Sequence, residues 1–396
     1  LWIVTSIYSV GYMRSLKEKH QTGYFAAFAM CLAATMGIAF AANLLTFFVF
    51  FEVLTIATYP LVIHKRSSEA IRAGRKYLGY TLIAGQAFLV AVIWVNHMVP
   101  GGEFRPGGFL SEAFVSGRAS WGALCVFFVC FMLGCGVKAG VMPLHGWLPT
   151  AMIAPTPVSA LLHAVAVVKA GVFGVVRIVG YVYGVDLLQI LGLGQVLAVF
   201  AGITIVIASC IALGQDSLKR RLAYSTISQL SYIVLGMALG APAALLGGVL
   251  HIANHAFMKI TLFFCAGSIY AHTGKTKISE MGGLGRRMPL TFAAFTVGSL
   301  GMAGMPLFAG FVSKWKLGLG AFEGGHWPYI VVLVISAILN IGYFFPVILH
   351  AYFGSPEKNE TYDEARWALL LPPVATAIVS ILLGIWPDVG PRFYSL

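Results

Sequence analysis

Residues 136–149 read GVKAGVMPLHGWLP, which places one lysine, one histidine, three glycines and two prolines between long apolar runs. Proline lacks the backbone N–H that an α-helix needs, and glycine readily adopts the left-handed conformation that ends a helix. Unwound backbone and water at such a break can solvate an ammonium group. The stretch therefore predicts a discontinuous membrane helix in which Lys138 is a functional cation.

The rest of the chain fits a polytopic membrane protein. The chain has 396 residues and is 59% hydrophobic and 10% charged, and its mean hydropathy is +0.86. Lipid cannot satisfy backbone hydrogen bonds, and the apolar runs lack the alternation of barrel strands, so the expected fold is all-α. A partial helix over residues 1–12 precedes eleven predicted spans: 24–41, 43–63, 77–98, 121–149, 157–180, 187–213, 222–240, 244–270, 290–319, 329–352 and 367–386.

The net charge of +12 reflects membrane topology, because the basic residues form no continuous face that would suit nucleic acid. Alternating the loops across the membrane, with 14–20 inside, puts only Arg105, Arg118 and Arg392 outside. Seventeen cations then lie inside, as expected for cytoplasmic loops: Arg14, Lys17, Lys19, Lys65, Arg66, Arg72, Arg75, Lys76, Lys219, Arg220, Arg221, Lys275, Lys277, Arg286, Arg287, Lys358 and Arg366. This asymmetry supports the helix count.

Two of the predicted spans are too long for a simple crossing, for which about 20 residues suffice. Residues 121–149 contain Pro143 and residues 290–319 contain Pro306, each close to glycines. Both spans are therefore predicted to be broken helices, the pattern that marks the site of inverted-repeat transporters.

Ionisable residues inside the spans are the candidate functional residues, since a charge at the membrane centre costs about 2.5–3.5 kcal/mol on insertion scales. Glu52 is expected to pair with a lysine of a neighbouring helix, and Lys138 is the best candidate. His251, His255 and Lys259 recur every four residues, which places them near one helical face over about 12 Å and favours a proton relay.

Other pairs are less clear from spacing alone. The HxxxH spacing could bind zinc, but no further Cys, Asp or Glu lies nearby, so a metal site is not expected. His163 and Lys169 are six residues apart, about 120° off a common face, and are predicted not to face the same neighbour. Lys314 and Lys316 point to nearly opposite sides, so that at most one faces the interior.

No motif for catalysis or cofactor binding is present in the sequence. It has no dinucleotide-binding glycine motif, no Walker loop and no paired helical histidines of a haem type. The six cysteines show no metal-ligand spacing and are interpreted as packing residues. We expect no catalytic residues, no cofactor and no bound metal, so a gradient or a partner must supply the energy.

Four motifs resemble the antiporter-like subunits shared by respiratory complex I, group 4 membrane hydrogenases and Mrp-type Na+/H+ antiporters. They are VKAGVMPLHGWLPTAMIAPTPVSALLHAVAVVKAGVFGVVRI (137–178), DSLKRRLAYSTISQLSYI (216–233), HIANHAFMKITLFFCAG (251–267) and GMAGMPLFAGFVSKW (301–315). The segment around 151–173 looks most similar to the D-type subunit of Mrp complexes.

The resemblance implies a subunit with two inverted five-helix repeats, each containing a discontinuous helix, and it implies that the first two helices are missing here. The corresponding boundaries are 1–20 for an N-terminal remnant, 21–185 and 186–353 for the repeats, and 354–396 for the last loop and helix. The family's proton-path residues fall on Glu52, Lys138, Lys169, His251, His255, Lys259 and Lys314, which selects Lys314 over Lys316. Some family members carry a glutamate in place of Lys314.

The expected function is proton translocation in a multisubunit Na+/H+ antiporter of the plasma membrane, with other membrane subunits, lipid, H+ and Na+ as partners and with no nucleic acid. In this hypothesis protons move from Lys138 through Lys169 and the central histidines to Lys314. One alternative is a proton-pumping subunit of NADH:quinone oxidoreductase or of a membrane-bound hydrogenase, whose redox chemistry lies in other subunits. A second alternative is a stand-alone carrier of a small organic solute.

Overall fold

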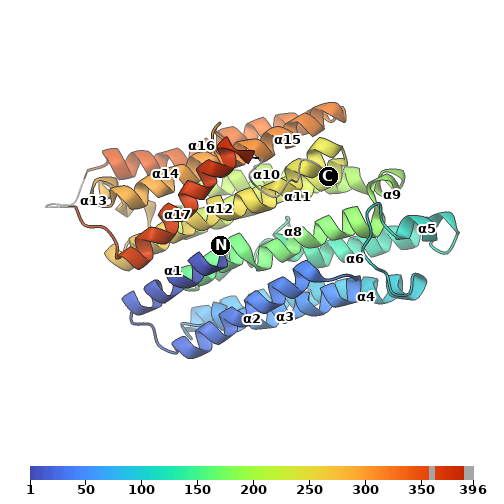
Figure 1. The fold of residues 1–396 in the computed structure, drawn as a ribbon, viewed down its shortest axis with the longest axis horizontal. Coiled ribbons are helices and arrows are strands. Elements are labelled where there is room, and N and C mark those ends of the chain that lie inside the picture. Colours follow the sequence, from blue (N-terminus) through green and yellow to red (C-terminus); the bar gives the residue numbers. More distant parts are fainter. Residues whose placement is uncertain (356–361, 388–396) are drawn as a thin grey trace.

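A computed structural model describes residues 1–355 and 362–387, in which helices run side by side along one axis (Figure 1). The long helices are α1 Trp2–Ser15, α2 Gln21–Phe40, α3 Leu44–Val62, α4 Ser68–Met98, α6 Trp121–Ala139, α8 Val167–Arg177, α10 Leu193–Leu213, α11 Leu218–Leu239, α12 Pro242–Thr273, α14 Pro289–Ala303, α15 Ala309–Glu323, α16 Trp327–Phe353 and α17 Trp367–Ile385. The short ones are α5 Leu110–Val115, α7 Thr156–Ala160, α9 Val185–Ile190 and α13 Leu284–Arg287, with the irregular turns η1 Thr150–Ile153, η2 Leu161–Val165, η3 Ile178–Tyr183 and η4 Ile278–Glu280.

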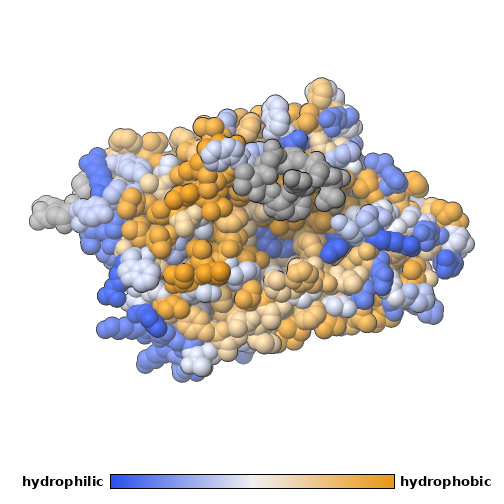
Figure 2. Space-filling model, viewed as in Figure 1, coloured by the Kyte–Doolittle hydropathy of each residue, from blue (hydrophilic) through white to orange (hydrophobic). Residues whose placement is uncertain are grey.

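The prediction of an all-α polytopic membrane protein is confirmed. Among the described residues, ten helices are long and apolar enough to cross a membrane, and each overlaps a predicted span. The largest differences are at α4, which begins at Ser68 and not at residue 77, and at α6, which ends at Ala139 and not at residue 149. The eleventh predicted span, 290–319, is divided into α14 and α15. The surface in Figure 2 carries hydrophilic groups at both ends and a broad apolar band between them. This distribution is expected where lipid surrounds the middle of the helices and water covers their ends.

Three of the loops predicted on the inner side lie at the same end of the bundle. The basic loops around Lys65, Lys219 and Lys275 meet at one end of the bundle, where they line a common cavity. The short helices α5 and α9 lie at the opposite end (Figure 1). The proposed repeat boundaries remain a prediction, and Lys358 and Arg392 lie outside the described residues.

The two broken spans differ in how far the helix resumes. In the first, α6 ends at Ala139, Gly140 adopts φ +74°, and residues 140–153 form turns and η1 where a second helical half was expected. In the second, the break is short and α15 resumes at Ala309. The difference follows from sequence, because Pro143 and Pro149 both interrupt the first segment, while Pro306 is the single proline within the second.

The span over residues 156–183 contains two π-helical turns, η2 and η3, on either side of α8. A π-turn holds more residues per turn than an α-helix, so it rotates every later side chain relative to a regular wheel. This rotation matters for His163 and Lys169, which lie on opposite sides of the end of η2.

Candidate functional site

Glu52 of α3 and Lys138 of α6 lie together in the N-terminal half. The Lys138 Nζ is 3.9 Å from Glu52 Oε1, and the lysine side chain is 1% exposed. Its ammonium donates a hydrogen bond to the Phe51 carbonyl and lies 3.3 Å from the centre of the Phe51 ring. The lysine thus has one carboxylate, one carbonyl and one aromatic face as partners, which offset the cost of burying its charge.

Local structure explains why both side chains reach this point. Lys138 lies in the last turn of α6, where the helix dipole favours a cation. The Trp147 indole donates to the Val137 carbonyl (2.8 Å), so the backbone after the break folds back onto the helix end. On α4, Gly85 leaves the space that Glu52 needs, because a Cβ there would lie 2.7 Å from Glu52 Oε1.

A second cluster lies where α8 meets α12. The Lys169 Nζ is 2.9 Å from His255 Nδ1, and the His255 and His251 rings have centroids 5.9 Å apart. Both histidines are fully buried and Lys169 is 7% exposed. The three side chains therefore form a buried row in which a proton can pass between Lys169 and His255. Among the described residues no hydrogen bond joins His255 to His251, and His255 Nε2 has no hydrogen-bond partner, so a proton moving between the two imidazoles needs water.

Neutral polar groups extend this row to Lys314. His251 Nδ1 lies 2.7 Å from the Ser313 hydroxyl, and its Nε2 lies 3.1 Å from Gln229 Oε1. The Gln229 amide donates to the Met302 carbonyl (3.3 Å), which also accepts the Lys314 ammonium (2.5 Å). Met302 belongs to the last turn of α14, whose carbonyls lack intrahelical partners at the break, so this helix end attracts a cation.

Lys259 follows His255 by one turn and turns toward α11. Its ammonium donates to the Leu222 carbonyl (3.1 Å) and to the Ser225 hydroxyl (2.9 Å), which also accepts a bond from Tyr343 (3.0 Å). The side chain is fully buried. Lys259 therefore forms a branch beside the row from Lys169 to Lys314.

The structure brings the predicted residues together in two groups. One contains Glu52 and Lys138, and the other contains Lys169, His251, His255, Lys259 and Lys314. Helices α6 and α8 pack closely at the junction, since a Cβ on Gly171 would lie 2.7 Å from the Lys138 carbonyl carbon. No hydrogen bond joins Lys138 to Lys169 within the described part of the chain, so a proton moving between them needs water.

The prediction that His163 and Lys169 face different neighbours is wrong. The His163 ring packs 5.0 Å from the Phe263 ring of α12, and Lys169 contacts His255 of the same helix. The wheel assumed a regular α-helix, and the π-turn η2 changes the phase between the two residues. His163 is fully buried without a hydrogen-bond partner for either ring nitrogen, so it is an additional candidate for the path.

The neutral groups Gln229, Ser313 and Ser225 were also missed. Ser225 and Gln229 lie four residues apart in a predicted span that also contains Thr226, Ser228 and Ser231, and this concentration of polar residues is a usable signal for a polar helical face. No group of three or more His, Cys, Asp or Glu side chains gathers among the described residues. The buried site thus consists of lysines, histidines, hydroxyls and amides with one carboxylate, which suits proton transfer.

Comparison with known proteins identifies the family. Residues 41–340 match the model described as NADH:quinone oxidoreductase/Mrp antiporter, TM. The chain belongs to this family. Its predicted resemblance is therefore confirmed, and with it membership among the antiporter-like subunits shared by complex I and Mrp complexes.

Relatives of both kinds cover almost the whole chain. NADH-quinone oxidoreductase subunit N of Desulforudis audaxviator is 34% identical over 96% of this chain and 76% of its own length. The F(420)H(2) dehydrogenase subunit L of Methanosarcina mazei is 32% identical over 98% of this chain, which spans 61% of that relative. The D-type subunit of the Na(+)/H(+) antiporter of Bacillus subtilis is 26% identical over 97% of this chain and 76% of its own length.

Solved structures show the same fold. A chain of an archaeal membrane-bound sulfane sulfur reductase superposes with a TM-score of 0.84 at 29% identity, over 94% of this chain and 74% of that chain. A chain of the Mrp complex from Dietzia superposes with a TM-score of 0.80 at 22% identity, over 98% of this chain and 80% of that chain. The fold is thus common to complexes that are named for different activities.

Proposed function

We propose that this chain is the proton-translocating subunit of a multisubunit monovalent cation/proton antiporter, with Na+ as the exchanged cation. The observation that carries the proposal is the succession of buried titratable and polar groups from Lys169 through His255 and His251 to Lys314. Buried ionisable groups are costly in a membrane and usually mark an ion path.

The Glu52–Lys138 pair controls access to this path. While Glu52 faces Lys138, the carboxylate stabilises the ammonium, and moving the carboxylate away favours release of the lysine proton. The released proton crosses to Lys169 through water and continues along the histidines. Cation movement through other subunits would drive the displacement of Glu52, which is how a sodium gradient couples to proton flow.

The test uses the assembled complex in inverted membrane vesicles that carry a pH gradient. Adding Na+ without any electron donor should collapse the gradient in the wild type. Glu52→Gln and Lys138→Ala should each abolish this response, whereas the exposed outer-loop variant Glu112→Gln and the exposed inner-loop variant Lys19→Ala should retain it. Near-normal exchange in both Glu52→Gln and Lys138→Ala would reject the proposed path.

The second candidate is a proton pump driven by electron transfer in partner subunits, favoured by the 34% identity to a quinone oxidoreductase subunit. In the same vesicles, it predicts that a pH gradient forms on adding an electron donor and that Na+ alone has no effect. Identification of the subunits that co-purify with this chain separates the two candidates independently. Small cation-transport subunits support the first, and flavin or iron–sulfur subunits support the second.

A further inference from the structure

A large cationic cavity, here called the basic vestibule, opens at the end of the bundle that carries the basic loops. Its volume is about 950 Å³, within the usual range of ligand pockets. Six cations line it: Lys65, Arg72, Lys76, Lys219, Arg220 and Lys275. Glu69 is the single acidic residue in its lining.

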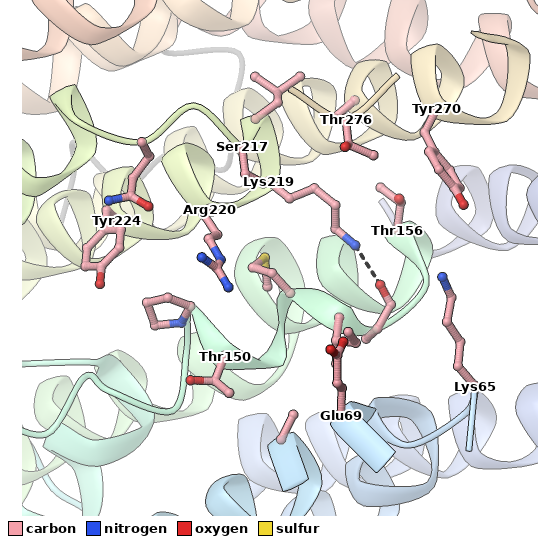
Figure 3. Close-up of a pocket in the computed structure, with 18 of the residues that line it drawn as sticks. Lys65, Glu69, Thr150, Thr156, Ser217, Lys219, Arg220, Tyr224, Tyr270 and Thr276 are labelled. Atoms are coloured by element: carbon pink, nitrogen blue, oxygen red, sulfur yellow. Dashed lines mark hydrogen bonds between the residues drawn. The ribbon is translucent and has the colours of Figure 1, made fainter. Parts of the chain in front are cut away.

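These cations converge from separate parts of the chain. Lys65 follows α3, Lys219 and Arg220 begin α11, and Lys65, Lys219 and Arg220 reach toward the same space (Figure 3). A general excess of positive charge on the cytoplasmic face would not require the side chains to gather around one hollow. Their convergence therefore points to a ligand as well as to topology.

Protein carboxylates do not neutralise most of this charge. Among the described residues, none of Lys65, Arg72, Lys76, Lys219 and Arg220 forms an ion pair with an acidic side chain. The Lys219 ammonium donates to the Ala154 carbonyl (2.6 Å) and the Lys76 ammonium to the Thr150 hydroxyl (3.2 Å). Both acceptors are neutral, so the positive potential of a concave site remains to attract an anion.

The start of α11 adds to the positive potential. No side chain caps this 22-residue helix, and its first turn contains no acidic residue. Asp216 lies two residues before the helix, where its carboxylate accepts hydrogen bonds from Ser279. Lys219 and Arg220 place two cations at the positive end of the helix dipole, an arrangement that a further anion in the cavity would stabilise. Backbone N–H groups of such a helix end bind phosphate readily.

We infer that the basic vestibule binds a phosphate group, carried by an anionic phospholipid or present as inorganic phosphate. A phosphate offers several acceptor oxygens and up to two negative charges, which suits a site with arginine forks, ammonium groups and hydroxyls from Ser217 and Thr276. A proton or metal cation is disfavoured by the same charges. The inference does not depend on proton transport, because its direct readout is binding.

The test compares two double variants of the intact purified complex. Lys65→Gln/Arg72→Gln removes two vestibule cations, and Lys17→Gln/Lys19→Gln removes two exposed cations from another loop predicted on the same face. Phosphatidylglycerol binding is measured by native mass spectrometry against phosphatidylcholine, and inorganic phosphate binding is measured by equilibrium dialysis of radiolabelled phosphate. The single variant Arg220→Gln repeats the measurement if the double variant does not assemble.

We expect the vestibule variant to lose at least tenfold in affinity for one of the two phosphate probes, and the control variant to change by less than twofold. Selective loss of phosphatidylglycerol identifies a lipid headgroup, and loss of inorganic phosphate identifies a free anion. Equal behaviour of the two variants overturns the inference. Loss of a neighbouring subunit without any change in phosphate binding also overturns it, since the vestibule would then hold an acidic protein segment.

Discussion

Gln229 is the connection whose removal tests the proposed path most directly. Its amide oxygen accepts a hydrogen bond from His251 Nε2 at 3.1 Å, and its amide nitrogen donates to the Met302 carbonyl at 3.3 Å. The same carbonyl accepts Lys314. Gln229→Leu keeps a similar side-chain size and removes both hydrogen bonds, so it interrupts the row between the central histidines and Lys314.

The structural and functional costs of this change differ in size. Hydrogen bonds between membrane helices contribute about 0.6 kcal/mol on average and about 1.7 kcal/mol at most, so losing two costs about 1–3 kcal/mol of stability. Leaving His251 without its partner in the path raises the barrier to proton transfer by about 1–3 kcal/mol, which corresponds to a rate lower by a factor of roughly 5–150. Transport should therefore fall by a factor of roughly 5–150 while the complex still assembles.

The assay measures the initial rate of Na+-driven proton movement in vesicles together with the apparent melting temperature of the purified complex. Gln195→Leu is the matched control, because Gln195 makes one hydrogen bond to Tyr329 (3.3 Å) away from the row. Gln229→Glu should recover part of the transport, since a carboxyl group can still serve His251. If Gln229→Leu and Gln195→Leu transport equally well, a proton path through Gln229 is refuted.

Three further perturbations test other contacts. Gly85→Ala should reduce the transport rate severalfold, because its Cβ would lie 2.7 Å from Glu52 Oε1 and displace the carboxylate. The control Gly79→Ala, whose Cβ would have no atom within 4 Å, should transport normally, and equal rates in the two variants would contradict this explanation. Arg221→Met should lower the melting temperature by several degrees, since Arg221 is 8% exposed and donates to the carbonyls of Gln215 (2.9 Å) and Tyr343 (2.8 Å). The exposed control Arg75→Met should leave it unchanged, and a smaller loss in Arg221→Met than in Arg75→Met is the contrary result. Hydrogen bonds from the Ser279 amide (3.0 Å) and hydroxyl (2.8 Å) lower the pKa of Asp216 in the folded protein. The stabilisation by Asp216 is therefore fully present above its ordinary pKa and is lost as the pH falls through the lower folded pKa. Melting temperatures of wild type and Asp216→Asn should differ near neutral pH and converge in acid, and a difference that is constant with pH would refute this interaction.

The membrane explains why the helices could be located from the sequence. Lipid requires long apolar helices and rejects unpaired backbone, so hydropathy alone locates the spans that include α3, α6 and α12. The same cost makes buried charges conspicuous, and charge balance is enough to suggest Glu52 as the partner of Lys138, 86 positions away in the sequence. The structure places these two groups 3.9 Å apart.

Sequence periodicity could not reveal the phase change at η2 or the neutral parts of the path. A π-turn depends on the packing of one short segment, so a regular helical wheel assigns His163 to the wrong side. Serine and glutamine can each form hydrogen bonds in membrane helices, and only contacts across helices distinguish Gln229 from polar groups that bond locally. Proline count, by contrast, could have predicted that the first break is longer than the second.

The two ends of the proposed path differ in a way that gives the path a direction. Proton loss from Lys138 leaves the Glu52 carboxylate buried without its cation, and neither Glu52 oxygen has a hydrogen-bond partner among the described residues. Proton loss from Lys314 leaves two neutral partners, the Tyr232 ring and the Met302 carbonyl, which Gln229 and Asn340 also contact. Release at Lys138 therefore requires Glu52 to move or to take up a proton, whereas release at Lys314 does not. We therefore expect the driving cation to act on the path at the Glu52 end. Variants of Lys314 should lower the maximal transport rate and leave the Na+ concentration needed for half-maximal transport nearly unchanged.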